Sequence, residues 1–213
     1  MILLIANEKG GCGKSSLSVN LATIRISEGH DVLMIDADRQ ETASYWSATR
    51  DENEIAPRVP CIQKTGKIHT EVKHLAEKYE DIIIDTGGRD SAEVRSGMIV
   101  ADVLLCPFRA SQFDIWTLDK LEDIVSKAKE INEGLRVIGL INLTSTNPSV
   151  HEVGETQDFI KEYDYITLAP SDIKDRIVWR KSIREGRAVM EFKPEDKKAV
   201  QEIRTLYKEI FNG

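Results

Sequence analysis

The chain has 213 residues, of which 41% are hydrophobic and 31% are charged. This composition excludes a disordered or collagen-like chain and suffices to bury the core of a globular domain. The apolar runs, such as residues 2–6 and 82–84, are far shorter than the roughly 20 residues of a membrane-spanning helix, and a formal charge of −7 argues against a protein that coats nucleic acid by bulk electrostatics.

Short β-branched runs alternate with amphipathic stretches along the chain. We expect strands near residues 2–6, 31–36, 58–63, 81–85, 102–106, 136–142 and 165–169. The alternation predicts an α/β fold, with a mostly parallel sheet of roughly seven strands covered by helices on both faces. Residues 44–68 are the least regular stretch and predict an irregular excursion, whereas residues 195–212 predict an amphipathic helix. Ligands of such sheets collect where the strands end, so we expect the chemistry there.

Other features of the sequence bear on domain number and cell compartment. No linker, repeat or low-complexity tract divides residues 1–213, which predicts one domain. The N-terminus is typical of a strand and not of a signal peptide, so we expect a cytoplasmic protein. The cysteines, Cys12, Cys61 and Cys106, match neither a disulfide framework nor metal-ligand spacing, and we expect them to be reduced.

A glycine-rich segment follows the first expected strand and precedes a helical run. It consists of Lys9, Gly10, Gly11, Cys12, Gly13, Lys14, Ser15 and Ser16. Glycines in this position let backbone N–H groups surround phosphate oxygens at a helix N-terminus. In this pattern Lys14 reaches the β- and γ-phosphates, and the Ser15 hydroxyl ligates Mg²⁺. Glu8 stands where the standard motif has its first glycine, and the alternative is an ordinary glycine-rich turn.

The segment resembles KGGxGK[ST][ST], the deviant Walker A motif of the ParA/MinD superfamily of P-loop ATPases, and the resemblance extends over nearly the whole chain. It implies a Rossmann-like P-loop NTPase fold, ATP or ADP and Mg²⁺ as ligands, and ATP hydrolysis. It also implies that Lys9 is the signature lysine, which reaches across an ATP-dependent homodimer to the phosphates of the partner subunit. A cation supplied in this way neutralises charge that develops during phosphoryl transfer, so dimerisation would be a condition for hydrolysis.

Two further expected strands end in carboxylates, as a magnesium-phosphate site requires. Asp36 and Asp38 leave the second strand at i and i+2, and therefore point the same way. Asp85 follows three isoleucines, which is the form of a Walker B motif. By analogy with the family, Asp36 supports the Mg²⁺ shell, Asp38 positions the hydrolytic water, and Asp85 holds Mg²⁺ through water. Arg39 stands where the family usually has proline.

The residues expected around the γ-phosphate and the base carry weaker signals. Gly87 and Gly88 follow Asp85, and their N–H groups could distinguish ATP from ADP. Asn142 ends a strand where family members use asparagine against adenine, and its amide has both a donor and an acceptor. Pro170 matches a second segment of the family's adenine pocket. Ordinary strand-end turns are the alternative for these positions.

The C-terminal third contains a basic run. It comprises Lys174, Arg176, Arg180, Lys181, Arg184 and Arg187, with two acids among them, Asp175 and Glu185. The local net charge is therefore +4, which leaves −11 on the rest of the chain. If the run is one helix, its four arginines fall within roughly an 80° arc. Such an arc would bind DNA without sequence preference and with a strong salt dependence, although a solvated charged face is the alternative.

The basic run also resembles that of short, ParF-like plasmid-partition ParA proteins. The resemblance implies a cycle in which the ATP-bound dimer holds nonspecific DNA on the nucleoid, and a small ParB-like partner stimulates hydrolysis and release. No helix-turn-helix precedes the first strand, so we expect no operator recognition. The alternatives are a MinD-like ATPase that uses residues 195–212 on a membrane, and a ParA-like ATPase that positions a conjugation complex or protein cargo. We disfavour an iron–sulfur reductase because no cysteine lies in the loop after Asp85. We disfavour an amide ligase because no substrate pocket can be identified from the sequence.

Overall fold

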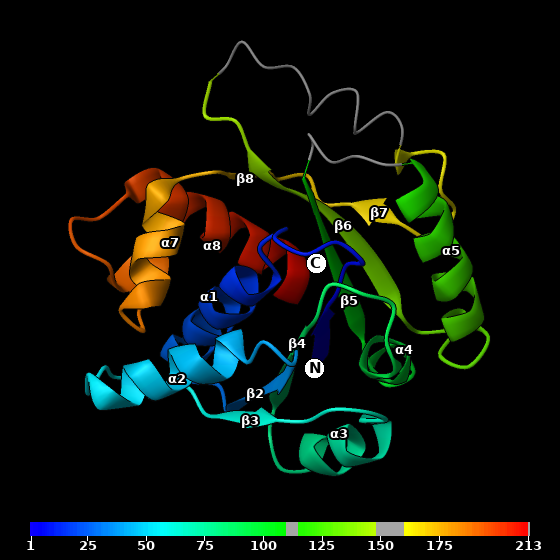
Figure 1. Cartoon of the computed structure of the whole chain (residues 1–213), viewed down its shortest axis with the longest axis horizontal. Coiled ribbons are helices and arrows are strands. Elements are labelled where there is room, and N and C mark those ends of the chain that lie inside the picture. Colours follow the sequence, from blue (N-terminus) through cyan, green and yellow to red (C-terminus); the bar gives the residue numbers. More distant parts are fainter. Residues whose placement is uncertain (110–114, 148–159, 213) are drawn as a thin grey trace.

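A single parallel sheet forms the centre of the molecule (Figure 1). The computed structural model describes residues 1–109, 115–147 and 160–212. The order of the strands is β3-β2-β4-β1-β5-β6-β7, and β8 also pairs with β6, off this path. The strands are β1 (Ile2–Ile5), β2 (Val32–Ala37), β3 (Cys61–Gln63), β4 (Asp81–Thr86), β5 (Val103–Arg109), β6 (Arg136–Thr144), β7 (Thr167–Leu168) and β8 (Ile173–Lys174). The fold class is confirmed, and β8 is an eighth strand that the sequence did not indicate.

The central strands are buried along their whole length because helices cover both of their faces. All six residues of β2 and all six of β4 are buried. These two strands pair in register, with Asp36 opposite Asp85. Parallel strands end at the same edge, so the register alone brings the two carboxylates together.

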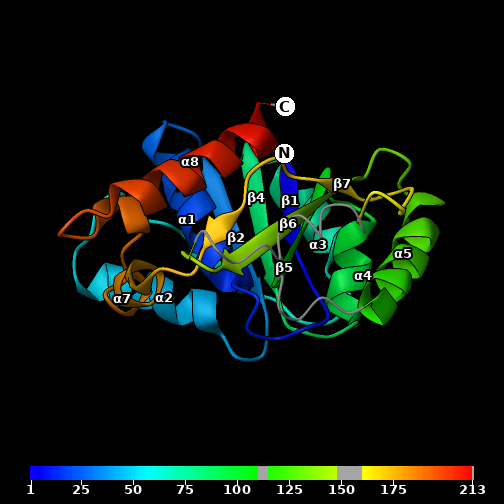
Figure 2. The ribbon, with the colours of Figure 1, turned by 90° about the horizontal axis from the view of Figure 1, so that it is seen from above.

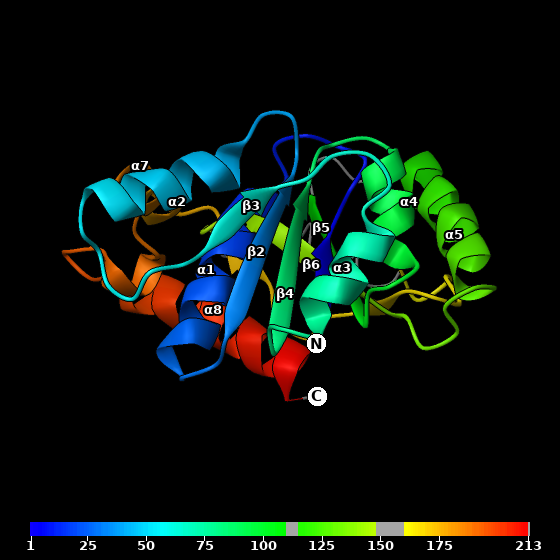
Figure 3. The ribbon, with the colours of Figure 1, turned by 90° about the horizontal axis from the view of Figure 1, so that it is seen from below.

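The helices form two layers, which Figures 2 and 3 show from opposite sides. Their bounds are α1 (Lys14–Ser27), α2 (Thr42–Glu52), α3 (His69–Ala76), α4 (Ala92–Met98), α5 (Ile115–Lys129), α7 (Ile177–Arg184) and α8 (Lys197–Phe211), with a 3₁₀ turn, η2 (Val189–Glu191). One core contains side chains of α1, α2, α7 and α8. The other contains side chains of α3, α4 and α5. Within the described ranges, no helix is long and apolar enough to cross a bilayer.

The stretch 44–68 is more regular than its sequence indicates, and the expectation of an irregular excursion is wrong for much of it. Residues 42–52 form α2, and the edge strand β3 follows a loop. The charges of α2 conceal its buried face, which carries Ala43, Trp46 and Arg50. Arg50 is fully buried and bonds both carboxylate oxygens of Glu191, at 2.6 and 2.7 Å.

The amphipathic C-terminal segment is confirmed as a helix packed on the domain. The apolar face of α8 carries Ile203, Leu206 and Ile210, each with no exposed surface. These side chains belong to the same core as α1. Because full burial of each such side chain contributes roughly 1.5–3 kcal/mol, release of this face to a membrane would cost the domain much of its stability.

Candidate nucleotide-binding site

The glycine-rich loop connects β1 to α1, as the sequence predicts. Gly11 and Gly13 have φ values of 73° and 89°, a left-handed conformation that glycine adopts without strain. Gly13 also lies against β6, because a Cβ atom there would be 2.5 Å from Nδ2 of Asn142. The two glycines therefore give the loop the tight curvature that a phosphate cradle requires.

Lys14 begins α1, and its side chain is only 7% exposed. Its Nζ donates to the Lys9 carbonyl at 3.1 Å and lies 3.7 Å from Sγ of Cys12. Among the described residues, no carboxylate lies within ion-pair distance of this ammonium group. This ammonium group is suited to bind an anion. A phosphate oxygen would replace the neutral Lys9 carbonyl as its acceptor, and hydrogen bonds to charged acceptors are stronger.

Asp36 and Asp85 lie together at the carboxyl edge, where their register places them. Asp36 accepts hydrogen bonds from the N–H groups of Asp38, at 3.1 Å, and Ser44, at 2.7 Å. Asp85 accepts from the Ser18 hydroxyl at 3.2 Å. The pKa of Asp85 is raised to about 7, mainly by burial and also by the neighbouring charge of Asp36, against the opposing hydrogen bonds from Ser15 and Ser18.

These residues suit a divalent cation with oxygen ligands. The second oxygen of Asp85, Oδ2, is buried without a hydrogen-bond partner among the described residues. Two adjacent buried carboxylates are costly unless a cation compensates them. The carboxylates and the Ser15 hydroxyl are hard ligands of the kind that Mg²⁺ prefers, so the donor set fits the predicted metal.

Two glycines bring the loop after β4 against the other two loops of the site. A Cβ atom at Gly87 would lie 3.1 Å from Oδ1 of Asp38, and one at Gly88 only 2.7 Å from the backbone nitrogen of Gly10. No side chain fits at position 88 unless one backbone moves. The loops after β1, β2 and β4 therefore meet at one place.

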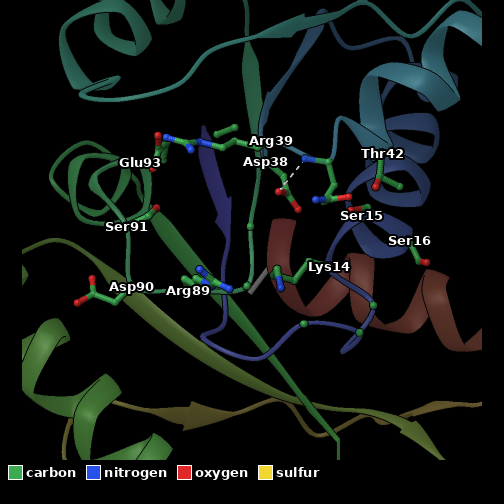
Figure 4. A pocket seen from close by; sticks show the side chains of 17 residues that line it. Lys14, Ser15, Ser16, Asp38, Arg39, Thr42, Arg89, Asp90, Ser91 and Glu93 are labelled. Carbon is green, nitrogen blue, oxygen red and sulfur yellow. Dashed lines mark hydrogen bonds between the residues drawn. The ribbon is translucent and has the colours of Figure 1, made fainter.

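These loops enclose a cavity of about 770 Å³ (Figure 4). Its predicted lining residues are Gly10, Gly11, Gly13, Lys14, Ser15, Ser16, Asp38, Gly87 and Gly88. The lining residues that the sequence analysis did not assign are Ala37, Arg39, Gln40, Thr42, Arg89, Asp90, Ser91 and Glu93. Most of these follow a motif on a loop, where no periodicity marks them, although their proximity to Asp38 and Gly88 in the sequence was an available signal.

The profile of the CobQ/CobB/MinD/ParA nucleotide-binding domain matches residues 3–189. The chain belongs to this family. ParA/MinD-type members are nucleotide-binding ATPases that act in positioning and partitioning, which agrees with the phosphate loop and the acidic strand ends described above.

Two curated relatives are similar to this ParA/MinD-type chain over most of their length. The chain is 26% identical to maintenance of carboxysome distribution protein A of Halothiobacillus neapolitanus, over 98% of the chain and 95% of the relative. It is 23% identical to sporulation initiation inhibitor protein Soj of Bacillus subtilis, over 81% and 85%.

The fold is shared with a plasmid partition protein of Borrelia burgdorferi bound to AMPPNP, with a TM-score of 0.75, 19% identity and coverage of 99% and 98%. It is also shared with an ATP complex of Cyanothece McdA, with a TM-score of 0.78, 17% identity and coverage of 98% and 95%.

The remaining predicted nucleotide residues lie outside the cavity lining. The N–H of Lys9 donates to Oδ1 of Asn7, two residues earlier, at 3.2 Å. Lys9 is not among the residues that line the cavity. Cys12 is buried, and burial raises the pKa of its thiol despite Lys14 nearby. Asn142 donates to the Cys12 carbonyl at 2.7 Å, which leaves its buried Oδ1 without a partner among the described residues. Pro170 is exposed. The adenine contacts stay predictions.

The basic run is not one helix, and the predicted arc of four arginines is wrong. Lys174 belongs to β8, Arg176 precedes α7 in an extended conformation, and Arg187 follows Gly186, whose φ of 69° ends the helix. Arg176 also turns inward, with Nη2 2.6 Å from Oε1 of Glu202 on α8, and both side chains are 17% exposed.

The other cations of the run lie nearer to solvent. Lys174, Arg180 and Arg187 pair with Asp172, Asp175 and Glu185, at 2.9, 3.1 and 3.5 Å. Such exposed pairs are weak and exchange readily with other anions. Lys181 and Arg184 are exposed on α7 and have no ion pair within the part of the chain that the structure describes. The exposed positive charge of the run is therefore centred on α7.

Proposed function

We propose that this protein is an Mg²⁺-dependent ATPase whose ATP-bound homodimer binds nonspecific DNA and positions a cargo along it. The observation that carries the proposal is the meeting of three loops, which bring Lys14, Ser15 and Asp38 to one cavity. The buried Asp36–Asp85 pair lies next to this cavity, with Asp85 beside Ser15. A plain nucleotide-binding turn would need only the glycine-rich loop, and an isolated acidic pair would need only the two strand ends. The meeting of all three loops is what an ATP-hydrolysing site requires.

Each group of the site has a role that follows from its position. Lys14 and the N–H groups of the glycine-rich loop bind the β- and γ-phosphates. Ser15, Asp36 and Asp85 hold Mg²⁺, which neutralises charge on the phosphates during transfer. Asp38 is partly exposed at the cavity, and its Oδ2 makes no hydrogen bond within the described chain. This oxygen is the group that orients the attacking water.

The ATPase proposal is tested with three single variants in the presence of Mg²⁺. Lys14→Ala should abolish ATP binding, because it removes the buried cation. Asp38→Ala should bind ATP and dimerise but lose turnover, by about 10²-fold or more. Lys9→Ala should bind ATP as the wild type does and lose turnover, since its lysine acts on the partner's nucleotide. Normal phosphate release by Asp38→Ala would remove Asp38 from the mechanism.

The DNA-binding part of the proposal rests on α7. Two copies of its exposed cations on one closed dimer would bind more tightly than one copy, without any new contact. The −11 carried by the rest of the chain opposes DNA binding by the monomer, so binding should require ATP. A ParB-like partner that stimulates hydrolysis would then release the dimer from the nucleoid.

A charge-reversal pair and a matched control test the DNA surface. Lys181→Glu with Arg184→Glu should abolish the ATP-dependent retardation of random-sequence DNA at low salt, because each lost phosphate contact removes counterion release. The control, Lys73→Glu with Lys78→Glu, makes the same change in net charge on and just after α3, in the other helix layer (Figure 3). Equal loss in both variants would mean that only the total charge matters, and retained binding in the α7 variant would exclude this surface.

A protein assembly is the second candidate cargo, since the relative with 26% identity is named for carboxysome distribution. Both cargoes would use the same ATP and DNA cycle, so the activating partner distinguishes them. A stimulating partner that itself binds DNA indicates a plasmid or chromosome, whereas one that binds a protein assembly indicates that assembly. The membrane alternative is disfavoured because the apolar face of α8 is buried, and it predicts liposome binding that is lost when residues 200–213 are deleted.

A further inference from the structure

Arg89 is a cation of the cavity for which the motifs give no role. It follows Gly88 directly and lines the cavity together with Lys14 (Figure 4). Three cations line this cavity, Lys14, Arg39 and Arg89, and three acids line it, Asp38, Asp90 and Glu93. The question is which of these cations is left for a ligand.

Arg39, Glu93 and Asp90 each lie near a group of opposite charge other than Arg89. Arg39 lies beside Glu93 in Figure 4. Burial alone would raise the pKa of Glu93, but the Gly66 N–H, which donates at 2.6 Å, and the charge of Arg39 lower it. Asp90 bonds Arg95, through Nε at 2.7 Å and through Nη2, and its carboxylate points away from Arg89 in Figure 4. Asp90 is thus paired with Arg95, while Glu93 accepts a hydrogen bond from Gly66 and has the charge of Arg39 nearby.

Arg89 itself is exposed and has no ion pair among residues 1–109, 115–147 and 160–212. Its backbone is nevertheless fixed on both sides. Gly88 abuts the Gly10 backbone, while Asp90 is held by Arg95 and Ser91 caps α4 by accepting from the Val94 N–H at 3.3 Å. An unpaired guanidinium on an anchored loop beside the phosphate cradle is positioned to bind an anion.

We propose that Arg89 binds the γ-phosphate of ATP and so makes the site prefer ATP over ADP. This inference rests on the proposed ATPase function. A guanidinium presents two parallel N–H donors to phosphate oxygens, and its charge cannot be lost by deprotonation. Because Arg89 is on the same loop as Gly87 and Gly88, the contact would also pull that loop toward the nucleotide and report the γ-phosphate to α4.

The experiment compares the dissociation constants of AMPPNP and ADP, with Mg²⁺, for the wild type, Arg89→Ala, Arg89→Lys and Arg39→Ala. Arg89→Ala should weaken AMPPNP binding by about tenfold to hundredfold and leave ADP binding nearly unchanged. Arg89→Lys should fall between, because it keeps the charge but loses the bidentate geometry. Arg39→Ala removes equal charge from the same cavity and should affect both nucleotides alike.

The possible results separate the two ideas. If the wild type binds neither nucleotide, the proposed ATPase function fails. If the wild type binds both and Arg89→Ala keeps its preference for AMPPNP, the Arg89 inference is overturned and the ATPase function stands. Equal loss of preference in Arg39→Ala would also overturn it, since the effect would then be one of bulk charge. Thermal melts of each variant without nucleotide check that the fold is intact.

Discussion

Arg50 offers the sharpest test of how the structure is held together. Its side chain has no exposed surface. The guanidinium donates to the carbonyls of Pro57 and Gly186, at 2.8 and 3.0 Å, and forms the two bonds to Glu191. It also lies 5.3 Å from the centre of the Trp46 ring. Arg50→Ala would leave a carboxylate that is 17% exposed and two carbonyls without their donor.

The expected cost follows from the burial. Removing one partner of a buried ion pair destabilises a protein by about 3–5 kcal/mol, and for a chain of this size each kcal/mol lowers the melting temperature by roughly 2–4 °C. We therefore expect Arg50→Ala to melt about 10 °C or more below the wild type. The assay is thermal and urea unfolding, followed by circular dichroism.

Arg58 provides the control, because it forms an ion pair with Asp51 that lies near Arg50 in the sequence but is exposed to solvent. Its side chain is 75% exposed and lies 3.1 Å from Asp51. Arg58→Ala should change stability by no more than about 0.5 kcal/mol. A loss in Arg50→Ala no larger than that in Arg58→Ala would refute the reasoning that burial sets the cost.

Two other predictions concern the nucleotide site. Gly88→Ala should abolish ATP binding while the protein still folds, because the new methyl group would lie 2.7 Å from the Gly10 nitrogen and push the phosphate loop away. Gly134→Ala, where the nearest atom would be 3.8 Å away, is the control, and ATP titration that gives equal affinities for both variants would contradict the contact. Asp85→Asn should raise the melting temperature of the nucleotide-free protein by a few degrees, about 1 kcal/mol or more, because it removes a carboxylate whose charge burial disfavours. It should also lose the extra stabilisation that Mg²⁺ with ATP gives the wild type, and a variant that keeps this gain would exclude Asp85 as a metal residue.

The sequence predicts the sheet well because each strand is marked by consecutive residues along the chain. The run of isoleucines in β4 can only be buried, and an aspartate after such a run lies at the edge where parallel strands end. The phosphate loop is equally local, since its glycines and Lys14 are consecutive. These are the parts of the site that were predicted with the correct strand, loop and helix.

The parts that were missed depend on contacts between distant segments. Nothing near Arg176 reveals that it pairs with Glu202, 26 residues later, and the charge of that run was therefore overcounted as a DNA surface. The same holds for Gly88, whose neighbour Gly10 lies on another loop. From the sequence alone, Arg50 of α2 is expected to be exposed, because its partner Glu191 lies far away along the chain.

The position of α2 has a mechanical consequence. At one end, the Ser44 N–H bonds Asp36, and Thr42 lines the cavity. At the other end, Arg50 bonds the Gly186 carbonyl, just beyond α7. An α-helix of 11 residues is a stiff rod about 16 Å long. If nucleotide binding shifts the loop after β2, α2 would tilt as a rigid body and move α7 at its other end. The position of the exposed cations of α7 would then depend on whether the cavity is occupied.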